Sequence, residues 1–184
     1  MDKVRSNRFQ ISHKDSFGFL RTALGGATTW TPRVFRNTGI VLDHVAKGDV
    51  FTYTIQFNHD KALQANVDDF HLHFAPVGAI TAGQVVSINY SWGLFPIGSE
   101  IPDTLPNTGN SPITLAVADL NKHKVADIVQ NLVISGVETY SSFLFIRCER
   151  LNTAADTYAS EIALIGADCH YTTDRRGSLS TYSE

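Results

Sequence analysis

The feature of this chain that most constrains its fold is a set of short segments in which apolar and polar residues alternate. The alternation is clearest in two groups: Phe51, Tyr53, Ile55 and Phe57, and then Val86, Ile88, Tyr90 and Trp92. A period of two places each apolar group on one face of a β-strand. Two such faces can pack against each other, so the pattern predicts a β-sandwich.

Similar segments recur along the rest of the chain. The predicted strands cover residues 49–59, 69–75, 84–92, 111–117, 132–135, 142–150 and 161–172. Short strands separated by turn residues are typical of an all-β sandwich or barrel. The apolar residues of segment 118–130 have mixed spacing, and we expect one short helix there. Segment 95–112 is rich in proline and glycine, so it cannot be a central strand. It forms either an exposed contact loop or a crossover along the edge of the sandwich.

The length of the chain and the distribution of its apolar and polar residues predict one domain with extensions at both ends. A chain of 184 residues, 43% of them hydrophobic, suffices for one sizeable core. We expect an N-terminal arm over residues 1–48, a sandwich over 49–172 and a polar tail over 173–184. The arm carries too many apolar residues for a solvated segment. It therefore packs on its own sandwich or on a neighbour, through residues such as Phe17, Phe19, Trp30 and Phe35.

Charge and composition argue against several classes of partner. The formal net charge is −3, and Lys and Arg are scattered, so nucleic acid is not an expected partner. A membrane span needs roughly 18 consecutive apolar residues, and the chain has no such window. Both cysteines, Cys148 and Cys169, fall inside predicted strands, and we expect buried free thiols.

One pair of histidines has a spacing that would suit the ligands of a metal ion. His71 and His73 would lie on the same face of a strand, about 6.6 Å apart, while Phe70, Leu72 and Phe74 face the core. Another strand could add a third ligand, from His59 or His170. The pair resembles that of the cupin barrels, but the glutamate that the cupin pattern has a few residues downstream is missing, and Pro76, Val77 and Gly78 stand there instead. Hydrogen-bonded structural histidines are therefore our interpretation, and a metal site at His71, His73 and His170 is the alternative.

Catalytic signatures are missing from the sequence. There is no Gly-x-Ser-x-Gly nucleophile motif, and neither cysteine has the local sequence of a nucleophile. The carboxylates have no spacing that defines an acid and base pair, and the pair Gly25 and Gly26 forms no phosphate-binding loop. We expect a protein that is not an enzyme and that needs no cofactor.

Two stretches of the chain contain distinctive motifs. The first runs from His59 to Trp92 and contains Phe-His-Leu-His-Phe-Ala-Pro at 70–76. The second begins at Ala155 and contains Asp-Cys-His-Tyr-Thr-Thr-Asp at 168–174, followed by Gly-Ser at 177–178. In both stretches the chain resembles a group of small virion structural proteins of tailed bacteriophages. The group usually has Trp at the position of Phe74 and an acidic or aliphatic residue at that of Cys169. The resemblance implies a jelly-roll-like sandwich displayed on a phage particle, often as a homo-oligomer.

These expectations combine into one functional hypothesis. We expect an auxiliary capsid subunit, a decoration or cement protein, made in the bacterial cytoplasm and incorporated into the virion. Its partners would be the major capsid protein or other virion proteins, and its own copies, with a trimer favoured. The alternative is a tail or head-fibre appendage that binds a host receptor or carbohydrate, or a tail or collar component.

Overall fold

The protein is built almost entirely from β-strands in the part of the chain that the structure describes. The computed structural model describes the backbone of residues 12–17, 19–22, 31–56, 60–96, 98–129 and 142–177, and the side chains of 32–56, 70–96, 98–129 and 142–169. The strands are β1 (Ser12–Phe17), β2 (Phe19–Thr22), β3 (Thr31–Val34), β4 (Val41–Val45), β5 (Val50–Gln56), β6 (Asp60–Pro76), β7 (Val85–Phe95), β8 (Asn107–Thr114), β9 (Lys124–Val129), β10 (Phe143–Arg150) and β11 (Ile162–Gly177).

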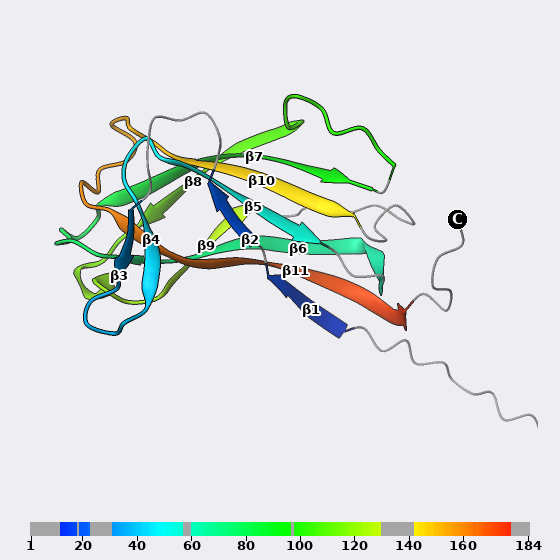
Figure 1. The fold of residues 1–184 in the computed structure, drawn as a ribbon, viewed down its shortest axis with the longest axis horizontal. Helices are drawn as coiled ribbons and strands as arrows, with labels where there is room; N and C mark the ends of the chain where they lie inside the picture. The colour runs from blue at the N-terminus through cyan, green and yellow to red at the C-terminus, as the bar shows by residue number, and fades with distance from the viewer. Residues whose placement is uncertain are drawn as a thin grey trace, which may run out of the picture.

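The strands form two antiparallel sheets that pack face to face (Figure 1). Sheet A has the order β3-β4-β11-β6-β9, and β1 pairs with a further stretch of β11. Sheet B has the order β2-β5-β10-β7-β8. The strands from β4 to β11 thus give two four-stranded orders, β4-β11-β6-β9 and β5-β10-β7-β8, which is the arrangement of a jelly roll. The predicted all-β, jelly-roll-like antiparallel sandwich is confirmed.

The alternation seen in the sequence places the core between the sheets. On β5 the side chains of Phe51, Tyr53 and Ile55 are at most 1% exposed, and Val86 and Ile88 of β7 are fully buried. Strand β10 contributes alternate residues in the same way. Phe57 lies outside the described residues. Burial of large apolar side chains from both inner faces is what holds two such sheets together.

The helix predicted for residues 118–130 is wrong. A single 3-10 turn, η1 (Val117–Asp119), precedes strand β9, which pairs with β6. Ala126 and Ile128 are buried while Asp127 between them is exposed, as in a strand with one buried face, and Val129 at the end of β9 is buried as well. Pairing with Phe70 to Phe74, in the C-terminal part of β6, supplies partners for the β9 backbone, which a short isolated helix would not gain. Within the described residues no helix could span a membrane.

The proline-rich segment is shorter than predicted. Strand β8 begins at Asn107, inside segment 95–112, and ends before the predicted limit of 117. It contains Pro112, which faces Ser87 of β7. Strand β8 lies at the edge of sheet B, where a proline is tolerated because one side of the strand needs no ladder hydrogen bonds. The strand predicted at 132–135 lies outside the described residues.

Residues 12–22 connect both sheets at one side of the sandwich. Strand β1 pairs with β11 of sheet A, and β2, one residue later, pairs with β5 of sheet B. Strands β3 and β4 also belong to the region predicted as an arm, and they pair with each other in sheet A. At the other end of the chain, β11 continues to Gly177, into the predicted tail.

A buried ion pair joins several elements at one end of the sandwich. The side chains of Arg150 and Asp156 are both fully buried, and Arg150 Nε and Nη2 donate to the two carboxylate oxygens over 2.9 and 3.2 Å. Arg150 also donates to the carbonyl oxygens of Val45, Tyr158 and Ser160. Asp156 accepts hydrogen bonds from the backbone N–H groups of Ser87 and Tyr158 as well. The pair therefore ties β4, β7 and β10 to the segment that precedes β11.

Both cysteines are fully buried thiols, as the sequence predicts. Cys148 belongs to β10 of sheet B and Cys169 to β11 of sheet A. Burial raises the pKa of the Cys148 thiol well above its ordinary value, because the thiolate would lose its hydration. The thiolate is the reactive form.

We therefore expect the folded protein to react very slowly with a thiol reagent such as Ellman's reagent at pH 8. In denaturant, both thiols should react promptly, and absorbance at the two stages measures the difference. Prompt reaction of the folded chain would contradict this packing.

Candidate functional site

The two histidines of the His71-x-His73 pair lie on the outer face of sheet A. Phe70, Leu72 and Phe74 are fully buried, while His71 and His73 are partly exposed. The predicted orientation of this strand is confirmed. The pair therefore lies where neighbouring strands of sheet A can reach it.

Three further residues join this pair. His71 lies opposite Asp168 of β11 on one side and Asp127 of β9 on the other. Its Nε2 is 3.0 Å from Asp127 Oδ1, and its Nδ1 is 3.5 Å from Asp168 Oδ1. His73 Nε2 is 3.2 Å from Asp168 Oδ1, and its Nδ1 is 2.7 Å from Nε2 of His123. We call these five residues the histidine cluster.

Most of the histidine cluster could not be predicted from the sequence. Asp127 and His123 lie in the region predicted as a helix, so their approach to His71 and His73 depends on the pairing of β9 with β6. Of the other ligands considered, His59 lies outside the described residues. The backbone of His170 faces Asp15, and its side chain is outside the described part.

The cluster links strands through pairs of side chains. Both ring nitrogens of His71 lie near aspartate oxygens, and those of His73 are divided between Asp168 and His123. Among the residues whose side chains are described, no group of three or more His, Cys, Asp or Glu could hold a metal ion. Chemically, such contacts tie β6 to β9 and β11 and orient the imidazoles.

We expect purified, untagged protein to contain far less than one equivalent of zinc, iron or manganese per chain. Added zinc should leave the melting temperature unchanged, because a ligand stabilises the fold only if it binds the folded state. Elemental analysis and a thermal melt measure the two. Stoichiometric metal would contradict this and would favour the alternative site at His71, His73 and His170.

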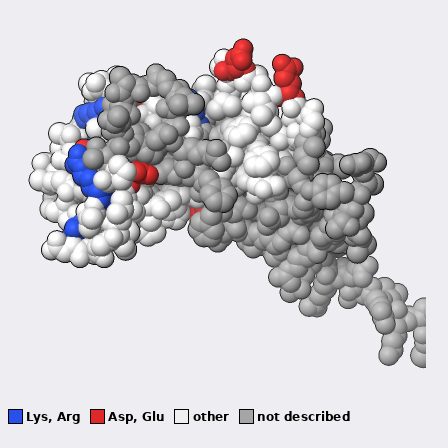
Figure 2. Space-filling view, viewed as in Figure 1, with Lys and Arg blue, Asp and Glu red and all other residues white. Residues whose placement is uncertain are grey.

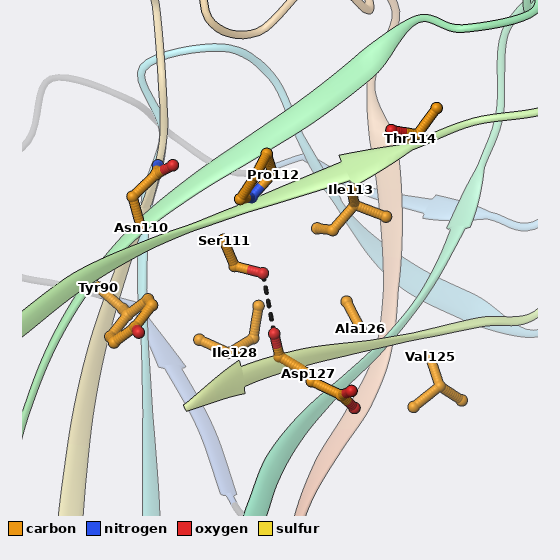
Figure 3. A pocket seen from close by; sticks show the side chains of 10 residues that line it. All are labelled: Tyr90, Asn110, Ser111, Pro112, Ile113, Thr114, Val125, Ala126, Asp127 and Ile128. Carbon is orange, nitrogen blue, oxygen red and sulfur yellow. Dashed lines mark hydrogen bonds between the residues drawn. The ribbon is translucent and has the colours of Figure 1, made fainter. Parts of the chain in front are cut away.

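The side of the sandwich formed by β8 and β9 is open. These strands are the edges of the two sheets in the described part of the chain, and a groove of about 560 Å³ lies between them. Figure 3 shows the hydroxyl of Ser111 on β8 directed at the main-chain carbonyl of Asp127 on β9, a hydrogen bond of 2.8 Å. Asp127 thus belongs to both this groove and the histidine cluster.

A second groove, of about 680 Å³, lies beside β3 and β4 and includes one of the predicted arm contacts. Phe35 lines it together with Arg33, His44 and Glu161. Glu161 Oε2 accepts a 2.7 Å hydrogen bond from Arg33 Nη1 and lies 3.3 Å from His44 Nδ1.

The other predicted arm contacts are described only in part or not at all. The backbone of Phe17 pairs with Asp168, and that of Phe19 pairs with Thr54. Trp30 and the side chains of Phe17 and Phe19 lie outside the described residues. Their role as contact residues stays a prediction.

The third groove, of about 750 Å³, lies against sheet B, and we call it the outer groove. It is bounded by residues of β7, β8 and β10 and by the loop between β7 and β8. The lining residues are Asn89, Tyr90, Ser91, Asp103, Thr104, Leu105, Thr108, Gly109, Asn110, Arg147 and Glu149. Most of these side chains are polar, in contrast to the apolar inner face of the same strands.

No protein-family model matches this chain, and no curated protein sequence matches it.

Proposed function

We propose that this chain is a virion structural protein of a tailed phage, an auxiliary capsid subunit that binds the outer shell and stabilises it. The observation that carries the proposal is the jelly-roll topology, β4-β11-β6-β9 against β5-β10-β7-β8. Jelly rolls recur in viral capsid domains, and the chain resembles phage virion proteins at 59–92 and 155–178. The protein would be made in the bacterial cytoplasm and incorporated into the particle.

An exposed apolar patch at β3 and β4 supports a protein partner. Val34 and Val41 face each other in the register of these strands and are 52% and 58% exposed, and the adjacent Ile40 is 58% exposed. Figure 2 shows basic side chains gathered at the same end of the molecule. Apolar side chains that remain exposed in a group mark interaction surfaces. We assign this patch to the contact with the major capsid protein or another virion protein.

The N-terminal strands support assembly with further copies of the chain. Residues 12–22 are attached through strand pairing to both sheets, and β2 is the edge strand of sheet B. A segment attached in this way can complete a neighbouring subunit, which is a common route to closed homo-oligomers. A trimer, with contacts through Phe17, Phe19, Trp30 and Phe35, is the form that we propose.

Cryo-electron microscopy of the phage particle tests the proposal. Copies arranged at regular positions on the capsid shell are the expected result.

The apolar patch at β3 and β4 is tested by the binding of purified protein to shells that lack this subunit, with a pair of matched variants. Val41→Asp should lose binding, because the charge would be desolvated in the contact. Val117→Asp, at a valine that is 60% exposed elsewhere on the surface, should bind normally. Equal binding by the two folded variants would exclude the patch.

The second candidate, a tail or head-fibre appendage, is favoured by the outer groove. The loop between β7 and β8 forms one wall of this groove, so an exposed loop and a polar surface lie together. Density confined to fibres or the tail would reject the capsid proposal and support this candidate.

A further inference from the structure

The outer groove has the size and position of a small-molecule site. Its volume of about 750 Å³ falls within the range of typical ligand sites, about 300–1,000 Å³. Its base is the outer face of three neighbouring strands, β8, β7 and β10, and its wall includes residues 103–105. A rigid sheet therefore positions the side chains at its base, and a loop limits its width.

The base carries a regular grid of polar side chains. Arg147, Ser91 and Thr108 are register partners on successive strands and form one row. Glu149, Asn89 and Asn110 form the next row in the same way. Neighbouring members of a row are about 4.8 Å apart, and the rows are about 6.8 Å apart along the strands. Hydrogen-bond donors and acceptors are thus distributed over an area that matches one or two sugar rings.

Hydrogen bonds hold part of this grid in place. Asn110 Nδ2 lies 2.9 Å from Asn89 Oδ1 and 3.0 Å from Ser87 Oγ. Both Nη atoms of Arg147 lie 3.4 Å from Glu149 Oε2. The side chains of Arg147 and Glu149 remain 46% and 37% exposed, so a ligand can reach them. Planar side chains held in this way lose little conformational freedom when a ligand binds.

An aromatic surface continues the outer face of β10 beyond the grid. Phe143 and Phe145 lie on the same face of the strand as Arg147, and their rings are stacked with centroids 6.2 Å apart. Phe95 of β7 packs against Phe145 at 5.4 Å. Phe143 is 38% exposed. An aromatic ring offers a flat apolar surface on which the C–H face of a sugar can pack.

The charged residues that line the outer groove limit the class of ligand that it can bind. The lining residues include one cation, Arg147, and two carboxylates, Glu149 and Asp103. Figure 2 shows acidic side chains on the upper part of the molecule, where the loop between β7 and β8 lies. This balance disfavours phosphate and other anions. A neutral sugar combines many hydroxyl groups with an apolar C–H face, which matches both parts of the surface.

We propose that the outer groove binds a neutral carbohydrate, with Arg147, Glu149, Asn89 and Asn110 bonding its hydroxyl groups. This goes beyond the role in the capsid, since a glycan site can operate on a shell or on a fibre. The grid selects polyhydroxylated ligands, and the adjacent aromatic surface adds affinity for a second ring.

Affinity electrophoresis of the full-length protein tests the proposal, with gels containing dextran, laminarin, galactomannan or xyloglucan, and with alginate as an anionic probe. At least one neutral polysaccharide should retard the protein, and alginate should not. Thr108→Trp fills the groove and should abolish the retardation. Thr114→Trp makes the same change on the same exposed face of β8, outside the outer groove, and should have no effect. Asn89→Ala should weaken binding by about tenfold, as expected for one or two lost hydrogen bonds.

Two results would overturn the proposal: no retardation by any neutral polysaccharide, or equal retardation of Thr108→Trp and Thr114→Trp. Retardation by alginate alone would also overturn it, because it would indicate an anion site. The outcome is separate from that of the capsid proposal. Microscopy locates the protein on the particle, whereas electrophoresis measures its ligand.

Discussion

Replacing Arg150 by methionine should lower the free energy of unfolding by about 3–5 kcal/mol. Asp156 would then be a fully buried carboxylate without its main counter-ion, since Lys47 Nζ lies 3.5 Å from its Oδ1 and is partly exposed. The carbonyl oxygens of Val45, Tyr158 and Ser160 would also lose a donor. Urea unfolding followed by tryptophan fluorescence measures the change. A loss of this size is much of the stability of a typical domain.

Arg147→Met is the matched control for this change. Arg147 lies on the same strand, is 46% exposed, and pairs with Glu149 at 3.4 Å. An exposed pair of this kind contributes about 0–1 kcal/mol, so the control should unfold nearly as the parent protein does. The double variant Arg150→Met with Asp156→Leu should recover part of the loss, because neither buried charge remains. Equal midpoints for the Arg150 and Arg147 variants would contradict the buried ion pair.

Replacing Phe70 by alanine should cost about 3–5 kcal/mol. Phe70 is fully buried on β6 of sheet A, and its ring lies 5.9 Å from that of Tyr53 on β5 of sheet B. The change removes a contact between the two sheets and leaves a cavity, because close-packed neighbours relax only partly. Urea unfolding at 25 °C is the measurement.

Phe143→Ala makes the same chemical change on the outer face of β10, where the side chain is 38% exposed. It should cost about 1 kcal/mol or less, since less apolar area is lost from the folded state. If the two phenylalanine variants unfolded at the same urea concentration, the assignment of Phe70 to the core between the sheets would be wrong.

Strands with strict alternation could be predicted well from the sequence. β5, β10 and the described part of β6 bury alternate residues between the sheets, and β7 buries Val86 and Ile88 there, as expected for half-buried strands. Phe143 and Phe145 of β10 lie on the outer face instead. The strand in segment 118–130 could not be recognised from the sequence, because β9 is short and its apolar residues Val125 and Val129 disturb the alternation. Its strand form depends on hydrogen bonds to β6, a partner 50 or more residues away in the chain, and local propensity carries no information on such a partner.

In the candidate surfaces, too, some features follow from the period of a single strand and others require the order and register of several strands. The orientation of His71 and His73 follows from the period of a strand, but Asp127 and Asp168 reach them through the order β11-β6-β9. The grid of the outer groove requires the register of β10, β7 and β8. Each of its residues is an ordinary polar side chain at an outward position, so no local pattern distinguishes the site.

The sequence by itself determined that the chain is an all-β sandwich, which faces of its alternating strands are buried, and that its two cysteines lie inside strands. Those properties depend on the period of apolar residues within one strand, which local sequence records directly. The tertiary structure alone decided the jelly-roll order, the joining of both sheets by residues 12–22, the histidine cluster and the outer groove. These features depend on pairing between distant segments, and the energy that selects one pairing comes from packing across the whole core.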